Sequence, residues 1–211
     1  MTTAAIAFLA AAAVFAVADW YAVARGDRRI EYVAKPAATL ALLGTAATLD
    51  AAHGDTQVLF VVALGASTVG DVFLMLPGDR FVPGLASFLV AQMLYAVGFA
   101  LHPGSAVGYV IAVVVAGVLV VPLAVRFVGA TRRAGAGALV PPLVAYMTAI
   151  SAMLVAAIAT GNGFAIAGAL LFAGSDALIA ETRFVTARPW APVTIMVTYH
   201  LAQAGLVLSL L

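Results

Sequence analysis

The sequence contains no cysteine and very little charge. Without cysteine the chain can form no disulfide bond, thiolate metal site or cysteine nucleophile. Only 9% of the 211 residues are charged and the formal net charge is +1, so no basic surface is available for a nucleic acid. A Gly-x-Ser-x-Gly elbow and a phosphate-binding P-loop are also missing, which leaves serine hydrolases and nucleotide-binding enzymes without support.

Hydrophobic residues dominate what is present. They make up 65% of the chain, and the mean hydropathy is +1.14. Soluble domains carry about 25% charged residues, far more than this chain. The composition therefore predicts a single all-α integral membrane domain over residues 1–211.

Helix breakers and charges divide the chain into eight apolar segments. A helix needs about 20 apolar residues to cross the hydrocarbon core of a bilayer. On that measure the predicted membrane helices are Ala4 to Ala24, Val33 to Leu49, Gln57 to Leu76, Val82 to Leu101, Ser105 to Val128, Leu139 to Thr160, Gly163 to Ala180 and Trp190 to Leu211.

All ten basic residues lie near the odd-numbered connections of this eight-helix scheme. They are Arg25, Arg28, Arg29, Lys35, Arg80, Arg126, Arg132, Arg133, Arg183 and Arg188. The positive-inside rule makes that side cytoplasmic and places both termini outside the cytoplasm. The excess of Arg over Lys and the many Ala and Val residues suggest a GC-rich bacterial genome, and so a bacterial plasma membrane.

The first segment also permits a different interpretation, a cleaved signal peptide. The small residues Ala16 to Ala18 resemble a cleavage site, but no positively charged region precedes them. Asp19, Trp20 and Tyr21, followed by Arg25, are better explained as an interfacial anchor at the end of a membrane helix.

Two aspartates, Asp71 and Asp176, lie within otherwise apolar helices that hold no Lys or Arg at membrane depth. A carboxyl group inside a bilayer costs about 2.5–3.5 kcal/mol on insertion scales, so such residues are candidates for a functional site. Gly70-Asp71 with Arg80 and Ser175-Asp176 with Arg183 recur four helices apart. This suggests parallel repeats over about 1–104 and 105–211, although chance similarity in Ala- and Val-rich sequence can produce the same pattern.

Polar residues at helical spacing accompany the aspartates. Gln92 and Tyr95 share a face in the fourth predicted helix, and Tyr199 and Gln203 share one in the eighth. Interhelical hydrogen bonding is the simpler explanation for these four. Lys35 either reaches to lipid headgroups or faces inward to neutralise a phosphate or an aspartate; spacing does not decide between these.

A metal site is not expected. His53 and His102 lie in connections on the side opposite the basic residues, and His200 has no further ligand near it in the pattern.

Several short motifs, in a particular order and spacing, resemble the YhhN-type lysoplasmalogenase family. They are Lys35-Pro36, Gly70 to Leu76, Phe81 to Phe88, Gln92 to Tyr95, Ala145-Tyr146, Ser151 to Met153, Gly168 to Phe172, Ser175-Asp176, Arg183-Phe184, Thr198-Tyr199 and Ala202-Gln203. The similarity extends over nearly the whole chain, although no single motif is specific.

The resemblance implies hydrolysis of the vinyl ether bond of a lysoplasmalogen to a fatty aldehyde and a glycerophospho-alcohol. Asp71 and Asp176 are the expected catalytic pair, one protonated as the acid and the other ionised. The expected substrate-binding residues are Lys35, Gln92, Tyr95, Tyr146, Tyr199 and Gln203. No cofactor or metal is implied, and the partners are the lysophospholipid and the bilayer.

Two other functions fit membrane aspartates. An intramembrane aspartyl protease would use them as a dyad, but its Gly-x-Gly-Asp signature is only half present because Thr68 replaces the first Gly and Ser175 precedes Asp176. A proton-coupled transporter or lipid-binding protein would use them as a relay. Against transport, no predicted helix is broken at mid-membrane by Gly and Pro together.

Overall fold

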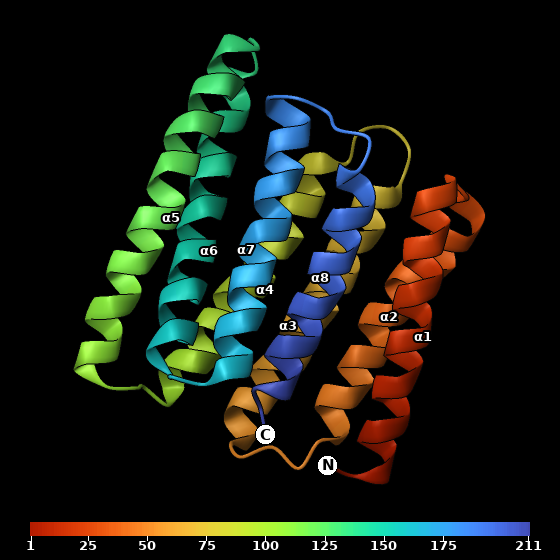
Figure 1. Ribbon diagram of the computed structural model, residues 1–211, viewed down its shortest axis with the longest axis vertical. Helices are drawn as coiled ribbons and strands as arrows, with labels where there is room; N and C mark the ends of the chain where they lie inside the picture. Colours follow the sequence, from red (N-terminus) through yellow and green to blue (C-terminus); the bar gives the residue numbers. More distant parts are fainter.

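The computed structural model covers residues 1–211 and is entirely helical. Eight α-helices run nearly parallel or antiparallel to one another, with a short 3₁₀ turn before the sixth (Figure 1). Their bounds are α1 Thr3–Arg25, α2 Arg28–Thr48, α3 Gly54–Met75, α4 Phe81–Leu101, α5 Ala106–Arg133, η1 Gly137–Leu139, α6 Val140–Ala159, α7 Gly163–Phe184 and α8 Ala191–Leu208.

Seven of these helices are long and apolar enough to cross a membrane. The remaining helix, α2, is of similar length but is not among these seven. Its first part carries the charged residues Arg28, Arg29, Glu31 and Lys35. The predicted all-helical fold is confirmed, and seven of the eight predicted membrane helices are long and apolar enough to cross a membrane.

The second helix begins earlier than the sequence predicts. Gly26 ends α1 in a left-handed conformation with φ of 70°, and the Asp27 side chain then caps the first turn of α2. The predicted start at Val33 is therefore too late, and Pro36 lies inside α2. The early start carries Lys35 away from the helix end and into the bundle, where it is only 4% exposed.

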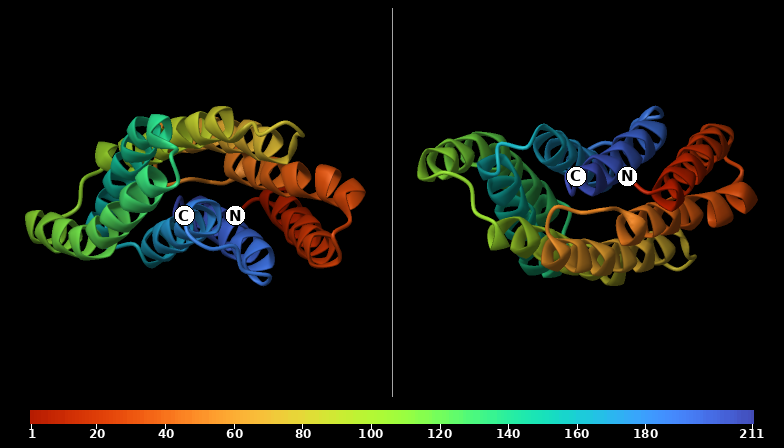
Figure 2. Two further views of the ribbon diagram at one scale, coloured as in Figure 1. Left: turned by 90° about the horizontal axis from the view of Figure 1, so that it is seen from above. Right: turned by 90° about the horizontal axis from the view of Figure 1, so that it is seen from below.

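The helices form two curved layers. Neighbour contacts place α2, α3, α4 and α6 in one layer and α1, α8, α7 and α5 in the other (Figure 2). Between the layers lies a core of 30 buried residues, many of them alanine, with larger side chains such as Phe60, Met153 and Phe172. Small residues allow neighbouring helices to approach closely, as is common in membrane bundles.

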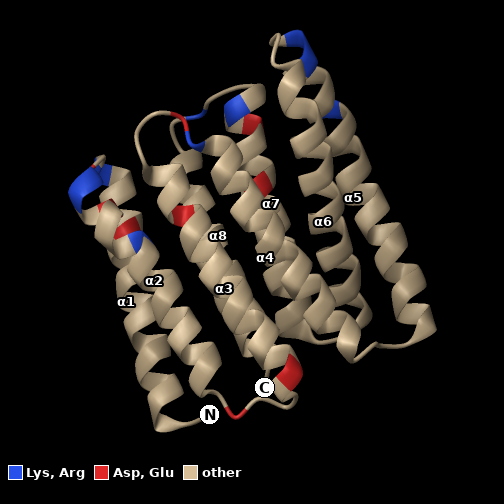
Figure 3. Ribbon diagram, turned by 180° about the vertical axis from the view of Figure 1, so that it is seen from behind, with Lys and Arg blue, Asp and Glu red and all other residues tan.

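Both termini lie at one end of the bundle (Figure 1). The Thr2 hydroxyl donates to the carbonyl of Thr48, and the Ala52 amide donates to the carbonyl of Leu210, so both termini are tied to the α2–α3 connection. Lys and Arg gather toward the opposite end, as Figure 3 shows. The basic residues therefore share one side of the bundle, as the eight-helix pattern predicts.

Candidate active site

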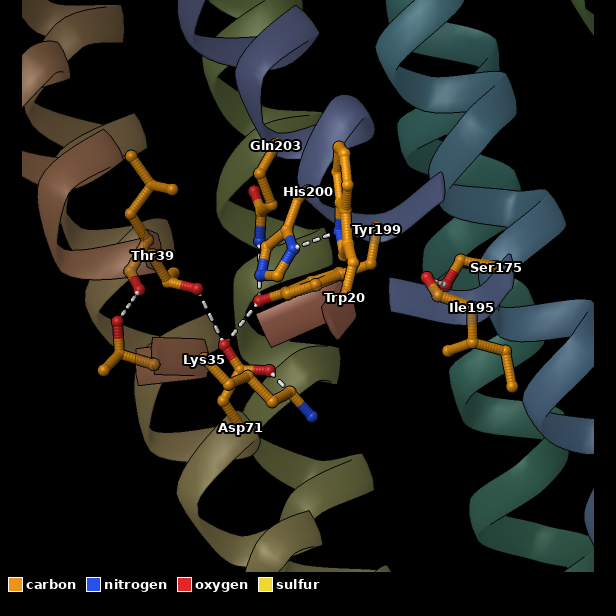
Figure 4. Close-up of polar contacts among 11 residues, drawn as sticks. Trp20, Lys35, Thr39, Asp71, Ser175, Ile195, Tyr199, His200 and Gln203 are labelled. Carbon is orange, nitrogen blue, oxygen red and sulfur yellow. Dashed lines mark hydrogen bonds and ion pairs between the residues drawn. The ribbon is translucent and has the colours of Figure 1, made fainter. Parts of the chain in front are cut away.

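Asp71 lies at the centre of a buried polar cluster. It is 0% exposed, and its Oδ2 accepts hydrogen bonds from the Thr39 and Tyr199 hydroxyls, both at 2.8 Å (Figure 4). The Lys35 ammonium lies 3.4 Å from Oδ1. Donors from α2 and α8 thus converge on a carboxyl from α3, an arrangement that suits an ionised, acceptor-only group.

A directed hydrogen-bond chain extends this cluster to α4. The Tyr95 hydroxyl donates to Gln203 Oε1 at 2.7 Å, and Gln203 Nε2 donates to the Tyr199 hydroxyl at 3.3 Å. Tyr199 in turn donates to Asp71, so every hydrogen bond of this chain is donated in the direction of the Asp71 carboxylate. The four predicted residues Lys35, Tyr95, Tyr199 and Gln203 therefore belong to one site around Asp71.

Asp176 has a separate and smaller set of neighbours. The Tyr146 hydroxyl donates to Asp176 Oδ2 at 2.5 Å. The fully buried amide of Gln92 lies beside that hydroxyl but completes no hydrogen bond with it. Tyr146 and Gln92 thus lie with Asp176, and no side chain forms a hydrogen bond or ion pair with both Asp71 and Asp176.

An apolar cavity of about 280 Å³ adjoins Asp176. It lies between α4, α5, α6 and α7, and 19 of its 21 lining residues are hydrophobic. Asp176 and Tyr146 lie in its wall, and Asp71 does not. Leu119 and Leu170 also line it and are 44% and 39% exposed. Its volume is close to the lower end of the range for small-molecule sites, about 300–1,000 Å³.

Phe88 separates this cavity from the Asp71 cluster. Its ring lines the cavity and makes edge-to-face contacts with Phe172 and Tyr199, at centroid distances of 6.3 and 5.8 Å. It also fills the space beside Gly70, where an added Cβ would lie 2.7 Å from the ring. Because Gly70 has no side chain, the Phe88 ring can pack beside it, between the carboxyl groups of Asp71 and Asp176.

The structure also reveals a second fully buried carboxyl in addition to that of Asp71, namely Asp19, which sequence reasoning missed. Asp19 is 0% exposed and faces the bundle, whereas the neighbouring Tyr21 is 57% exposed. The signal that singled out Asp71 was present here too, since Asp19 follows an uncharged apolar run in α1. His200 lies nearby, where its Nδ1 accepts a hydrogen bond from Trp20 Nε1 at 3.0 Å (Figure 4).

No three His, Asp or Glu side chains gather closely enough to hold a metal ion. The side chains in the two clusters carry carboxyl, hydroxyl, amide and ammonium groups. The long apolar helices define a multi-pass integral membrane protein, and the two carboxyl clusters and the apolar cavity between its helices are the candidate site.

The chain belongs to the YhhN family, whose model matches residues 30–210. It is 35% identical over 172 residues to the lysoplasmalogenase TMEM86B of Homo sapiens, covering 82% of this chain and 71% of that protein. It is 35% identical to the protein of that name from Sus scrofa, covering 70% of this chain and 61% of the relative. The corresponding protein of Mus musculus is 34% identical, over 75% of this chain and 66% of the relative. No solved structure matches this chain.

Proposed function

We propose that this protein is a membrane lysoplasmalogenase, a hydrolase that cleaves the vinyl ether bond of a lysoplasmalogen. The observation that carries the proposal is a carboxyl group, Asp176, in the wall of an apolar cavity. A hydrocarbon chain fits such a cavity, and an acid beside that chain supplies the chemistry that a vinyl ether needs. The relatives named lysoplasmalogenase support the same activity.

The reaction requires one proton donor and one water molecule. The acid transfers its proton to the β carbon of the vinyl ether, which leaves an oxocarbenium ion at the carbon bonded to oxygen. Water adds to that carbon and returns a proton to the carboxylate, and a hemiacetal results. The hemiacetal then breaks down. Its hydroxyl proton moves to the glycerol oxygen, the bond from carbon to that oxygen breaks, and the glycerophospho-alcohol and the fatty aldehyde are released. General acid catalysis of this kind contributes about 10²–10⁴-fold to the rate.

Asp176 is the better candidate for the acid. It lines the cavity, and Tyr146 is the one side chain that donates a hydrogen bond to it. Asp71 already accepts two hydrogen bonds and faces the Lys35 ammonium. Asp71 therefore acts as the ionised group, which orients Tyr199 and the hydrogen-bond chain through Gln203.

The substrate phosphate lies at the basic end of the cavity in this proposal. The Arg183 guanidinium lies 4.4 Å above the ring of Phe81, and Phe81 and its edge-to-face neighbour Phe184 line the cavity. Lys35, for which the sequence suggested this role, is 4% exposed and neutralises Asp71. Arg183 thus offers a phosphate contact without disturbing the buried ion pair.

The membrane arrangement follows from the same features. All eight helices cross the membrane, α2 with its charged first part at the basic end. The positive-inside rule makes that end cytoplasmic and the end with both termini extracytoplasmic. The membrane is the plasma membrane of a bacterium, as the composition suggests.

The two other functions receive less support. A protease dyad needs two aspartates that share a proton, whereas Asp71 and Asp176 have different partners and Phe88 lies between their sites. Transport would need a polar route, and the cavity wall is almost wholly apolar. Aspartate-dependent uptake into proteoliposomes without product formation would favour transport.

Mass spectrometry of products from a lysolipid panel tests the proposed function. The purified protein is incubated with lysolipids that share a headgroup and chain length but carry a vinyl ether, an alkyl ether or an ester. We expect fatty aldehyde and glycerophospho-alcohol from the vinyl ether lipid alone. Release of fatty acid from the ester, or no turnover of any lipid, would contradict it.

A further inference from the structure

Asp19 is a buried carboxyl that no step of the proposed reaction uses. It lies in α1, it is 0% exposed, and neither of its carboxyl oxygens has a hydrogen-bond partner. The family model begins at residue 30, so Asp19 lies outside the matched segment. A buried ionised carboxyl without partners is so costly that it takes up a proton or recruits a cation.

Lys35 is the cation available to Asp19. Asp19 and Lys35 lie at the same level of the α1–α2 hairpin, because each is eight residues from Asp27 in the turn, and both are buried. No other Lys or Arg is buried in the bundle. Arg25, at the end of α1, is exposed, and its guanidinium stacks over Tyr21. The Lys35 ammonium has three donors, and the one partner that it contacts is Asp71 Oδ1 at 3.4 Å.

The other titratable groups around Asp19 cannot balance its charge. Glu31 on α2 and Asp71 on α3 are themselves acidic. His200 on α8 accepts the Trp20 hydrogen bond at Nδ1, which makes its ring neutral with the proton on Nε2. One buried ammonium therefore faces two buried carboxyl groups, Asp19 and Asp71.

Charge balance then fixes the number of protons in this cluster. A second uncompensated negative charge in a buried site costs several kcal/mol, so one of the two carboxyl groups carries a proton. We infer that Asp19 and Asp71 form a proton-binding pair, which shares a single proton around the Lys35 ammonium. The proton resides on Asp19 in the observed arrangement, because Asp71 receives two hydroxyl donors and Lys35 whereas Asp19 receives none.

The pair has a simple alternative state. When the proton moves to Asp71, the ammonium pairs with the newly ionised Asp19, and the net charge of the cluster is unchanged. The inference goes beyond the proposed hydrolase and does not depend on it, since it rests on burial and charge alone. A failure of the lipid assay would therefore leave it intact.

Infrared spectroscopy of the purified protein at neutral pH tests the inference. The carbonyl stretch of protonated carboxylic acids is integrated per molecule for wild type, Asp19→Asn and Asp71→Asn. We expect each substitution to remove the same one-carboxyl intensity, because the remaining aspartate then pairs with Lys35 and ionises. Asp19→Asn that keeps the full band, or Asp71→Asn that keeps it while Asp19→Asn loses it, would overturn the shared proton.

A complementary variant and two controls complete the experiment. Lys35→Met removes the cation, so both carboxyl groups become protonated and the band grows by one carboxyl; no growth in folded protein would also overturn the inference. This variant keeps the test decisive if Asp71→Asn does not purify. Asp50→Asn, at a loop carboxyl whose side chain is 73% exposed, is the matched control and leaves the band unchanged. Asp176→Asn removes at most its own contribution.

Discussion

A carboxyl group inside a membrane helix needs a proton or a partner, and the three aspartates of this bundle meet that need differently. Asp71 has two hydroxyl donors and an ammonium, Asp176 has one hydroxyl and an apolar cavity, and Asp19 has no hydrogen-bond partner. Residues of one type therefore differ in chemistry because their neighbours differ.

The hydroxyl of Tyr146 is predicted to contribute to catalysis through Asp176. Tyr146→Phe removes the hydrogen bond to Oδ2 while it keeps the ring. Hydrogen bonds to charged groups are worth about 1.5–3 kcal/mol, so we expect vinyl ether hydrolysis to slow by about 10–100-fold. Tyr109→Phe is the control, since the Tyr109 hydroxyl lies on α5 away from both clusters. Wild-type rates in Tyr146→Phe would show that the contact plays no part.

The sequence identified the costly groups but not their partners. Asp71 and Asp176 stand out because a carboxyl in an apolar run is unusual, and the polar stripes of α4 and α8 follow from helical spacing. Spacing tells which residues share a face and not which helix that face meets. The assignment of Tyr95 to Asp71 and of Gln92 to Asp176, from adjacent turns of α4, required the packed bundle.

At the scale of elements, α7 and α8 meet through two glycines. A Cβ on Gly168 would lie 2.8 Å from the backbone nitrogen of Leu206, and one on Gly205 would lie 3.0 Å from the Cα of Gly168. Backbone atoms of a helix cannot move to relieve such a clash, whereas a flexible side chain can change its rotamer. These glycines therefore set the distance at which α8 delivers Tyr199 to Asp71.

Gly168→Ala is predicted to destabilise the bundle. Overpacking of a tight contact costs about 1–3 kcal/mol, so thermal unfolding in detergent shifts to lower temperature. Gly174→Ala on the same helix is the matched control, because a Cβ there meets nothing within 4 Å. Ala favours a helix over Gly by about 1 kcal/mol, so the control is neutral or slightly stabilising. Equal unfolding temperatures for the two variants would refute the close contact.

An ion pair joins the end of α7 to the α3–α4 connection. Arg183 donates to Asp79 Oδ2 at 2.7 Å, and this hydrogen bond lowers the pKa of Asp79 from its ordinary value of 3.8. A lowered pKa in the folded state stabilises the fold above the ordinary value, and the effect is lost as the pH falls through the lowered one. Wild type is thus expected to unfold at a slightly higher temperature than Asp79→Asn at pH 7, with the difference gone in strong acid. A difference that grows on acidification contradicts this sign.

Element boundaries show where sequence reasoning is weakest. Hydropathy predicted every helix, but it placed the start of the second helix at Val33 instead of Arg28. The charged residues at the start of α2 have the composition of a loop, so hydropathy assigns them to the connection before it. The cap at Asp27 is evident only from the structure, in which α2 begins before the apolar run. With the later start, Lys35 falls near the end of the predicted helix, and the pattern does not show that it is buried.

At the scale of the whole molecule, the two-layer order of the helices could not be derived from sequence. Most faces carry Ala, Val and Leu, which pack equally well against several neighbours. The repeat over about 1–104 and 105–211 stays a prediction. Asp71 on α3 meets α8 through Tyr199, and Gln92 on α4 lies near the pair of Tyr146 and Asp176. If a repeat relates the α3–α4 hairpin to the α7–α8 hairpin, the contact of α3 with α8 corresponds to the contact of α7 with α4.

The chain's lack of cysteine makes its topology directly testable. Single cysteines replace Arg29, Asp50 or Ala134, which are exposed residues in or near connections. A membrane-impermeant maleimide added to intact cells should label Asp50→Cys alone, because α2 and α3 to α5 separate it from the other two positions. Labelling of Arg29→Cys together with Asp50→Cys would mean that α2 does not cross the membrane.

The most direct test of the central claim is the rate of fatty aldehyde release from a vinyl ether lysolipid by the purified protein and its Asp176→Asn variant. Loss of the proposed acid should slow release by about 10²-fold or more. The control Asp50→Asn, changed at an exposed loop carboxyl, should match wild type. An Asp176→Asn protein that releases aldehyde at the wild-type rate would contradict the account.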